Sequence, residues 1–382
     1  MSRLRVVHVT AAPEMVLRIL LHDLRRLAQH CEHVIVCGEG RAVPRLRAEG
    51  LEVHTIPIER KVSPRADLLA LRALTRILRS RKPHLVHSYA PKGGLLGQLA
   101  AAASRTPHRI HSCRGLLYTD DLSSRRRLLF SATDRLTNAL ADRTLFVSSA
   151  DMRYSIDRRL CSPARAIHTG SGIDLTYFRR SPAVEDQARQ LREEHGIALD
   201  APLVLTVGRY VRDKGFLEIG AAVRSIQRAH PRVRFLWVAP VLEGEADALP
   251  DDHLVREGIA DVVTRVGLVE NMRPYYAAAN LLVHPTYREG VPRALMEASA
   301  MRLPIAASSI PGCREVISSE ALGFLFRARD PEDLARVVVN ALNERDDATR
   351  RADLAHERAH EVFDQDRLSE RIWKVYQEVL AT

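Results

Sequence analysis

Short runs of β-branched and other apolar residues alternate along the first half of this chain with longer stretches whose apolar residues recur at helical spacing. The stretches MVLRILLHDLRRLAQ and ADLLALRALTRILRSRK place apolar residues at i, i+3, i+4 and i+7, which is typical of amphipathic helices. Strands and helices that alternate in this way predict a parallel sheet covered on both faces. The predicted strands span residues 5–10, 33–37, 52–56, 84–87, 109–112 and 145–148.

The pattern weakens around residues 170–200, where the chain is polar and rich in turn residues, and then begins again with APLVLTVGRY. The runs VRFLWVA, DVVTRVG, NLLVHPT, LPIAAS and GFLFRA continue this second series. The predicted fold class is α/β, with two doubly wound Rossmann-like domains facing a cleft, and such folds bind ligands at the carboxyl ends of their strands. We place the domains at residues 1–180 and 181–365, and we expect the amphipathic segment 366–382 to pack back on the first domain.

The composition is that of an ordinary globular protein, with 46% hydrophobic and 27% charged residues among 382. No apolar run approaches the roughly 20 residues that span a bilayer, and the start MSRLRVVHVT passes into the first strand without a signal-peptide cleavage site. We therefore expect a cytoplasmic location. The five cysteines lie far apart with no C-x-x-C pair, which argues against a disulfide framework and a zinc knuckle.

Charge is divided unevenly between the two halves of the chain. Residues 1–180 hold 31 lysines and arginines against 15 aspartates and glutamates, a net charge of +16, whereas the remainder holds 26 against 32, a net charge of −6. This imbalance indicates either an anionic partner for the N-terminal half or an arginine-rich chain without one. Nucleic acid is disfavoured, because no zinc-finger spacing, aromatic-laced basic strand or basic dimerisation pattern occurs. An anionic membrane surface or a phosphate-bearing lipid fits at least as well. The run RRRLLF at 125–130 either rests on a membrane or forms a solvated basic helix face.

One candidate site follows the first strand of the second series. Neither half carries G-x-G-x-x-G after its first strand, and G-x-x-x-x-G-K-[ST] occurs nowhere, which disfavours a dinucleotide oxidoreductase and a P-loop NTPase. The sequence VLTVGRYVRDKG instead places Gly208 and Arg209 after a strand and Lys214 before a helix. The two cations can clamp a diphosphate and stabilise it as a leaving group. The alternative is a pair of solvated loop cations.

A second candidate site lies in YREGVPRALMEASA, which holds two glutamates eight positions apart. Glu289 falls in a loop, Pro292 suits the first turn of the helix that follows, and Glu297 lies between one and two turns inside it. One glutamate can reach a sugar and the other a ribose diol. The alternative makes Glu289 a helix-start acid and Glu297 a surface residue. Backbone N–H groups at the helix start can bind an anion in the segment that comprises Gly290, Val291, Pro292 and Arg293.

Together the two motifs resemble those of the family 4 retaining glycosyltransferases of the GT-B fold, and the resemblance extends over essentially the whole chain. The G-R-x(4)-K-G motif of that family is matched by residues 208–215, and its E-x(7)-E motif by Glu289 and Glu297. The resemblance implies that Arg209 and Lys214 hold a nucleotide diphosphate. It also implies that Glu289 contacts the donor sugar and that Glu297 binds the nucleoside ribose.

The first half shows a narrower likeness. VHVTAAPEM, HLVHSYAPKGGLLGQLAA, HRIHSCRGLLY and GSGIDLTYF look like segments of the bacterial subgroup that builds capsule, O-antigen or exopolysaccharide repeats on a polyprenyl diphosphate carrier. Where many relatives carry a His-Gly at the end of the fifth strand, this chain has Arg114 and Gly115. The substrate contact from this half is therefore expected to be Arg114, with His111 as the alternative. The segment 91–94 either binds an acceptor phosphate or simply starts a helix.

We therefore expect transfer of a hexose or N-acetylhexosamine from a nucleotide sugar, with UDP as the nucleotide. The acceptor would be a glycan, a polyprenyl-diphosphate-linked or a small hydroxylated molecule, and the resemblance implies retention at the anomeric carbon. No cofactor and no metal are expected, because the Arg209 and Lys214 clamp would replace a metal, and Asp364-Gln365-Asp366 resembles a metal-binding D-x-D only superficially. The alternatives are a nucleotide-sugar epimerase of similar fold and a non-catalytic peripheral membrane module, and the oligomeric state is left open.

Overall fold

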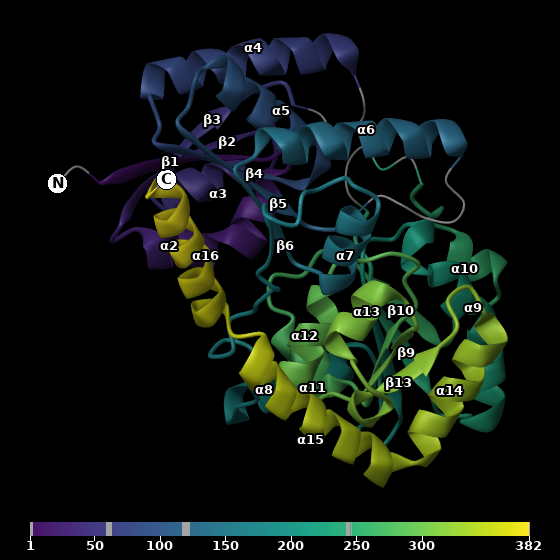
Figure 1. The fold of residues 1–382 in the computed structure, drawn as a ribbon. Helices are drawn as coiled ribbons and strands as arrows, with labels where there is room; N and C mark the ends of the chain where they lie inside the picture. Colours follow the sequence, from purple (N-terminus) through teal and green to yellow (C-terminus); the bar gives the residue numbers. More distant parts are fainter. Residues whose placement is uncertain (1–2, 59–62, 117–122, 242–244, 246, 382) are drawn as a thin grey trace. The chain divides into compact units, whose positions relative to one another are not determined.

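The computed structural model describes residues 3–58, 63–116, 123–241, 245 and 247–381. The chain forms two compact units (Figure 1). The first comprises Met1–Ser171 together with Gln365–Thr382, and the second comprises Gly172–Asp364. No helix among the described residues is long and apolar enough to cross a membrane.

The first unit is built on a parallel sheet with the strand order β3-β2-β1-β4-β5-β6-β7. All six strands predicted in this half are present, and their ends differ from the prediction by a residue or two. The seventh strand was not predicted, because it has only three residues and no apolar alternation. The strands are β1 (Leu4–Val9), β2 (Cys31–Cys37), β3 (Glu52–Thr55), β4 (Leu85–Tyr89), β5 (His108–Cys113), β6 (Arg143–Phe146) and β7 (Ala166–His168).

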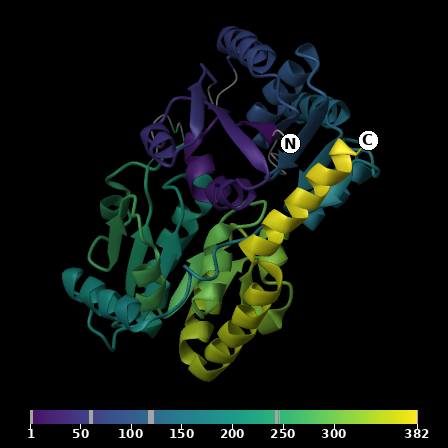
Figure 2. The same ribbon diagram turned by 90° about the vertical axis from the view of Figure 1, so that its left-hand side faces the viewer.

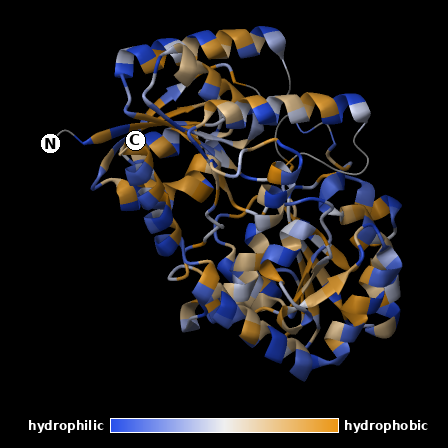
Figure 3. Cartoon of the chain, viewed as in Figure 1, coloured by the Kyte–Doolittle hydropathy of each residue, from blue (hydrophilic) through white to orange (hydrophobic). Residues whose placement is uncertain are grey.

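Alternating side chains of this sheet pack against helices on its two faces. Val7 and Val9 of β1 pack in one cluster with Leu74 and Leu96 from two helices, whereas Val6 packs on the opposite face. Figure 3 shows the apolar strands inside and mixed colours on the helices. The helices are α1 (Pro13–Met15), the π-helical turn η1 (Val16–Leu20), α2 (Leu21–Leu27), α3 (Val43–Ala48), α4 (Pro64–Arg81), α5 (Ala90–Ala103), α6 (Ser124–Leu140), α7 (Ser149–Asp157) and α16 (Gln365–Leu380).

The C-terminal helix α16 belongs to the core of the first unit. Val375, Tyr376 and Val379 are at most 5% exposed and pack with Val6 and Leu85 of the sheet. Burying apolar side chains of this size stabilises a fold by about 1.5–3 kcal/mol each. Figure 2 shows this helix, drawn in yellow up to the C-terminus. Removing it would expose one face of the central strands.

The second unit contains a parallel sheet with the strand order β10-β9-β8-β11-β12-β13, and all six strands predicted here are present. Two doubly wound α/β units confirm the predicted fold class. The strands are β8 (Leu203–Val207), β9 (Arg234–Val238), β10 (Val263–Val266), β11 (Leu281–His284), β12 (Ile305–Ser308) and β13 (Phe324–Phe326). The helices are α8 (Pro182–Glu194), the 3₁₀ turn η2 (Arg212–Lys214), α9 (Phe216–Ala229), α10 (His253–Arg256), α11 (Arg273–Ala278), α12 (Arg293–Ala300), α13 (Pro311–Val316), the 3₁₀ turn η3 (Glu320–Leu322), α14 (Pro331–Asn343) and α15 (Arg345–Val362).

The boundary between the units lies between Ser171 and Gly172, nine residues before the predicted boundary at 180/181. The polar composition of 172–180 hid its role, because a few residues in it carry the packing. Ile173 and Phe178 are buried in the core of the second unit, and the Ile173 N–H donates to the Phe363 carbonyl at 2.8 Å. This segment is therefore part of the second unit rather than the end of the first.

A chain of histidine and tyrosine side chains is buried in the first unit. His33 Nδ1 lies 3.0 Å from His8 Nε2, and His8 Nδ1 lies 2.9 Å from the Tyr89 hydroxyl. His87 Nδ1 lies 2.9 Å from the same hydroxyl and 2.6 Å from the Tyr376 hydroxyl of α16. Burial lowers the pKa of His33 to about 4 and the pKa of both His8 and His87 well below the usual value. The three imidazoles are therefore neutral in the folded unit near pH 7.

We expect the first unit to lose stability as the pH falls from about 6.5 towards 4. The unfolded chain binds a proton at His8, His33 and His87 near pH 6.5, whereas the folded unit binds them only at lower pH, so acid favours unfolding. Each group contributes a slope of up to about 1.4 kcal/mol per pH unit. The His33→Gln variant should show a shallower loss in this window, because one of these protons is then absent.

The two tryptophans allow each unit to be measured separately. Trp373 lies on α16 of the first unit and Trp237 on β9 of the second, so Trp237→Phe and Trp373→Phe each leave one reporter. Urea unfolding followed by fluorescence should show a steeper pH dependence for Trp373 than for Trp237. Equal slopes for the two reporters, or no effect of His33→Gln, would contradict the prediction.

Candidate functional site

The predicted site residues of the second unit lie where its strand order reverses. Strands β8 and β11 are neighbours in the sheet although 73 residues separate their ends. Arg209 and Lys214 follow β8, and Glu289 follows β11. The carboxyl ends of neighbouring parallel strands meet at one edge of the sheet, and in doubly wound folds ligands bind at this switch point. The topology therefore brings the two sequence motifs together.

The loop after β8 packs directly on the loop after β11. Gly215 has a φ of +75°, and a Cβ atom there would lie 2.0 Å from the Pro285 carbonyl oxygen. Only glycine tolerates both the left-handed conformation and this close approach. The Asp213 carbonyl also accepts hydrogen bonds from the Tyr287 N–H at 2.9 Å and from the Thr286 hydroxyl at 3.2 Å. The two loops thus form one rigid structure.

A second glycine confines the Glu289 loop from another side. A Cβ atom on Gly312, in the first turn of α13, would lie 2.3 Å from the Glu289 carbonyl oxygen and 2.7 Å from the Gly290 carbonyl oxygen. The sequence Ile-Pro-Gly-Cys indicates a helix start, but it does not reveal which backbone the glycine approaches. Gly312 is therefore a site residue that sequence reasoning missed.

Lys214 and Glu289 form an ion pair, with Nζ 2.6 Å from Oε1. Only 13% of the lysine side chain and 22% of the glutamate side chain are exposed. Burial opposes ionisation of Glu289, but the Lys214 ammonium, together with His284 whose Nε2 lies 3.6 Å away, holds its pKa at about 2. Glu289 is therefore a carboxylate at any physiological pH. His284, at the end of β11, is a further residue of this site that the sequence did not single out.

Arg209 is paired with a carboxylate that the sequence did not indicate. Its guanidinium forms an ion pair with Glu245, whose side chain is 5% exposed. Burial opposes the charge on Arg209, but Glu245 and the nearby Asp213 and Asp247 raise its pKa above the usual value. Glu245 lies in an acidic stretch, EGEAD, and this cluster of acidic residues was the only feature of the sequence that could have indicated a partner for Arg209. Both predicted clamp cations therefore have a carboxylate partner.

Glu297 lies on α12, at the depth in the helix that was predicted. The Tyr276 hydroxyl donates to its Oε2 at 2.8 Å, and Arg293 Nε lies 3.4 Å from its Oε1. Burial and the neighbouring carboxylate raise the pKa of Tyr276 well above the usual value, so this phenol stays a donor. Pro292 precedes the helix as its N-cap rather than occupying the first turn, since the helix begins at Arg293. Gly290 and Pro292 are buried, and Val291 between them is partly buried.

This group of side chains has the chemistry of a binding site for an anion that carries hydroxyl groups on either side. Arg209 and Lys214 supply two positive charges at the switch point, and charge-assisted hydrogen bonds of partly buried cations to phosphate are strong. Glu289 and Glu297 supply acceptors for hydroxyl groups. A phosphate would compete with the two carboxylate partners for the two cations.

In the first unit, the structure separates the two candidates at the end of β5. Arg114 is partly exposed and lines a pocket with His8, Asp23 and Ser112. His111 points to the other face, since a Cβ atom on Gly94 of α5 would lie 2.5 Å from its Cε1. Burial lowers the pKa of His111 to about 4. His111 is thus a core residue, whereas Arg114 is partly exposed in the pocket.

The segment 91–94 lies in the first turns of α5, and its glycines have packing roles. A Cβ atom on Gly93 would lie 2.8 Å from Thr10 Cα at the end of β1. Lys92 forms an ion pair with Asp67 of α4 at 2.6 Å. These contacts favour the helix-start interpretation of this segment.

Two family models match the chain, one in each half. Residues 13–170 match the glycosyl transferase 4-like domain, and residues 201–344 match the glycosyl transferases group 1. Together they match most of the chain.

Individual relatives agree with these models. The chain is 24% identical over 314 residues to a capsular polysaccharide biosynthesis glycosyltransferase of Staphylococcus aureus, covering 81% of this chain and 80% of that protein. It is 22% identical over 352 residues to a UDP-Gal:alpha-D-GlcNAc-diphosphoundecaprenol alpha-1,3-galactosyltransferase of Escherichia coli, covering 90% and 89%. The crystal structure of HepE from Anabaena with UDP and glucose superimposes with a TM-score of 0.83 at 17% identity, covering 98% and 100%. This structural likeness shows the fold.

We expect Gly312→Ala to destabilise the second unit by about 1–3 kcal/mol, because the added methyl group would overlap the Glu289 carbonyl. Urea unfolding followed by Trp237 fluorescence in the Trp373→Phe background measures this change. The matched control is Gly267→Ala, since a Cβ atom at Gly267 meets nothing within 4 Å. If the two variants unfold at the same urea concentration, Gly312 does not confine the loop.

Proposed function

Because this chain belongs to the glycosyl transferase group 1 family and is a glycosyltransferase, we propose that it transfers a hexose or N-acetylhexosamine from a UDP-sugar to a polyprenyl-diphosphate-linked glycan, with retention at the anomeric carbon. The observation that carries the proposal is the Lys214–Glu289 ion pair at the strand-order reversal. It joins the two motifs that the resemblance assigns to the donor. The epimerase alternative is disfavoured, because both matching family models describe glycosyl transferases.

The donor occupies the switch point of the second unit in this proposal. Its diphosphate replaces the carboxylate partners of Arg209 and Lys214, so that both cations face phosphate oxygens. Once Lys214 faces the phosphate, the Glu289 carboxylate is able to accept a hydrogen bond from a hydroxyl group of the donor sugar. Glu297 accepts hydrogen bonds from the ribose hydroxyl groups, and the hydrogen bond from Tyr276 holds the orientation of the Glu297 carboxylate. The relative that uses UDP-galactose and the fold neighbour that binds UDP support the choice of UDP.

The transfer step breaks the bond between the anomeric carbon and the diphosphate oxygen. Arg209 and Lys214 stabilise the negative charge that develops on the leaving diphosphate, an effect of a size that typically changes turnover by 10²-fold or more. The acceptor hydroxyl forms the new bond on the same face and gives its proton to the departing phosphate, which accounts for retention without a covalent intermediate. The two cations carry the charge that a metal would otherwise balance.

The acceptor is assigned to the first unit. Arg114 lines the pocket at the carboxyl end of β5 and supplies a cation for an acceptor phosphate. Two named relatives act in capsule synthesis and on a diphosphoundecaprenol-linked sugar, which supports a lipid-linked acceptor over a small hydroxylated one.

A lipid-linked acceptor requires contact with a membrane, and the first unit has a surface suited to it. Helices α4 and α6 both pack on α5 (Figure 1). On α6, Leu128 and Leu129 are 73% and 52% exposed, beside the exposed Arg125, Arg126 and Arg127. On α4, Leu68 and Leu69 are 49% and 56% exposed. Exposed leucines beside arginines fit the headgroup region of an anionic membrane, and we propose peripheral attachment through this surface from the cytoplasmic side.

We expect Arg209→Ala and Lys214→Ala each to lower turnover by about 10²-fold or more, because each removes a charge that stabilises the leaving diphosphate. Turnover is measured as UDP release from a panel of UDP-hexoses and UDP-N-acetylhexosamines, with a synthetic short-chain polyprenyl-diphosphate-linked N-acetylglucosamine as acceptor. Arg212→Ala is the matched control, since this exposed arginine lies in the same loop. Near-normal transfer by both variants would contradict the assignment of Arg209 and Lys214 to the leaving diphosphate.

We expect the protein to cosediment with phosphatidylglycerol vesicles and not with phosphatidylcholine vesicles. Replacing Arg125, Arg126 and Arg127 by alanine should weaken binding by roughly 100-fold, because each basic residue near an anionic surface contributes about 1 kcal/mol. Leu128→Glu should weaken it as well. Leu268→Glu, at an exposed leucine of the second unit, is the control and should have no effect. Binding that is unchanged by the triple replacement would refute this surface.

A further inference from the structure

The carboxylate of Asp23 is buried in the first unit, on a helix face that is otherwise apolar. The side chain lies on α2 next to Leu24, and the residue is 7% exposed. A buried carboxylate costs several kcal/mol unless it is paired and hydrogen-bonded, and an apolar residue would pack here without that cost. Its presence therefore calls for specific partners.

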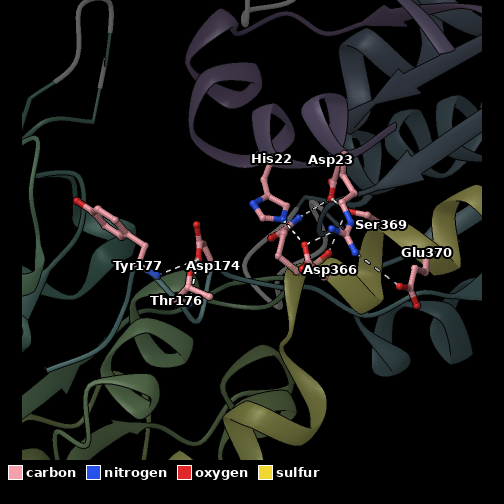
Figure 4. Close-up of polar contacts among 10 residues, drawn as sticks. His22, Asp23, Asp174, Thr176, Tyr177, Asp366, Ser369 and Glu370 are labelled. Atoms are coloured by element: carbon pink, nitrogen blue, oxygen red, sulfur yellow. Dashed lines mark hydrogen bonds and ion pairs between the residues drawn. The ribbon is translucent and has the colours of Figure 1, made fainter. Parts of the chain in front are cut away.

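Two of these partners come from the C-terminal helix α16. Gln365 Nε2 donates to Asp23 Oδ1 at 2.7 Å, and the Ser369 hydroxyl lies 2.7 Å from the same oxygen. Figure 4 shows Ser369 and Asp23 pointing toward one another between the two helices. Gln365 and Ser369 are 3% and 0% exposed, so these bonds are shielded from water. They join residues more than 340 positions apart in the sequence.

Arg114 provides the opposite charge. Asp23 and Arg114 line the same pocket, together with Tyr89 and Tyr376. Burial raises the pKa of Asp23, whereas Ser369, Gln365 and the positive charge of Arg114 act in the other direction. A guanidinium in the same pocket as a carboxylate held in one orientation is attracted toward it, because opposite charges attract strongly where water is largely excluded. The pocket thus contains a carboxylate fixed by two hydrogen bonds, and its negative charge favours one orientation of the Arg114 side chain.

We propose that Asp23, held by Gln365 and Ser369 of α16, is a positioning residue that orients Arg114 toward the acceptor phosphate. This inference rests on the proposed function, because it takes Arg114 as the acceptor-side cation. Helix α16 then serves the substrate site as well as the core of the first unit. Asp23 does not touch the acceptor and acts only through Arg114.

The rim of the same interface supplies a contrasting set of contacts. His22 Nε2 lies 2.7 Å from Asp366 Oδ1, and Arg26 lies within 3.9 Å of Glu370. The Glu370 side chain is 65% exposed and lies on α16 one position beyond Ser369. A change at Glu370 therefore tests whether any disturbance of the α2–α16 interface is enough to affect the pocket.

A double-mutant cycle on the full chain tests the proposal. The variants are Asp23→Asn, Arg114→Ala and the two combined, and the probe is geranyl diphosphate, titrated by calorimetry with UDP at saturation to occupy the donor site. Asp23→Asn removes the negative charge that would orient the guanidinium while keeping the shape of the side chain, and it should weaken probe binding on the order of tenfold. In the Arg114→Ala background, Asp23→Asn should have no further effect, because the residue through which it acts is gone.

Ser369→Ala removes one partner of Asp23 without altering a charge, and it should weaken probe binding in the same direction. Glu370→Gln is the control and should leave it unchanged. UDP affinity and the urea midpoint reported by Trp373 show whether a variant is folded. A loss caused by the core alone would move that midpoint and would persist without Arg114.

The outcomes separate the two levels of the proposal. If Arg114→Ala weakens probe binding and Asp23→Asn leaves it unchanged or strengthens it, the positioning role is wrong and the acceptor assignment stands. Multiplicative effects of the two changes overturn the positioning role in the same way. If the unmodified chain fails to bind the probe, or if Arg114→Ala binds it normally, the acceptor assignment fails together with the inference, whereas the donor assignment is tested separately by UDP binding.

Discussion

The ion pair between Lys214 and Glu289 is the interaction on which the site of the second unit depends. Its two charges are largely shielded from water, so each needs the other, and this requirement fixes the two loops that carry them. The close approach of Gly215 to the Pro285 carbonyl makes the pair possible, and Gly312 holds the glutamate from the other side. A phosphate that binds Lys214 gains a cation already desolvated and fixed in place, so little reorganisation is left to the reaction itself.

The fold was predictable because its signals are local. Apolar runs at strand length and amphipathic stretches between them specify alternating strands and helices. Of the thirteen strands among the residues that the structure describes, twelve followed from that pattern. The meeting of the two motifs was also predictable, since Arg209 and Lys214 follow β8, Glu289 follows β11, and the doubly wound order makes these strands neighbours. The pattern did not predict the boundary near Ser171, because a few buried residues decide the packing of a polar segment there.

The partners of the site residues could not be predicted for a different physical reason. Glu245 meets Arg209 across 36 positions and Gln365 meets Asp23 across 342, and neither pairing is encoded in any local periodicity. Asp23 did leave a trace, since it falls on the apolar stripe of MVLRILLHDLRRLAQ beside Leu24. A carboxylate at such a position requires a buried partner, but only the tertiary structure identifies it.

The position of α16 in the chain links the completion of the first unit to the synthesis of the second. The unit needs Val375, Tyr376 and Val379 to cover β1 and β4, yet this helix follows all residues of the second unit. Until it is made, Asp23 lacks both of its hydrogen-bond donors and His87 lacks the Tyr376 hydroxyl. Because unsatisfied buried polar groups cost about 1–3 kcal/mol each, the first unit reaches its final stability only once the last helix packs. The pocket around Arg114 is therefore complete only when the second unit has already been synthesised.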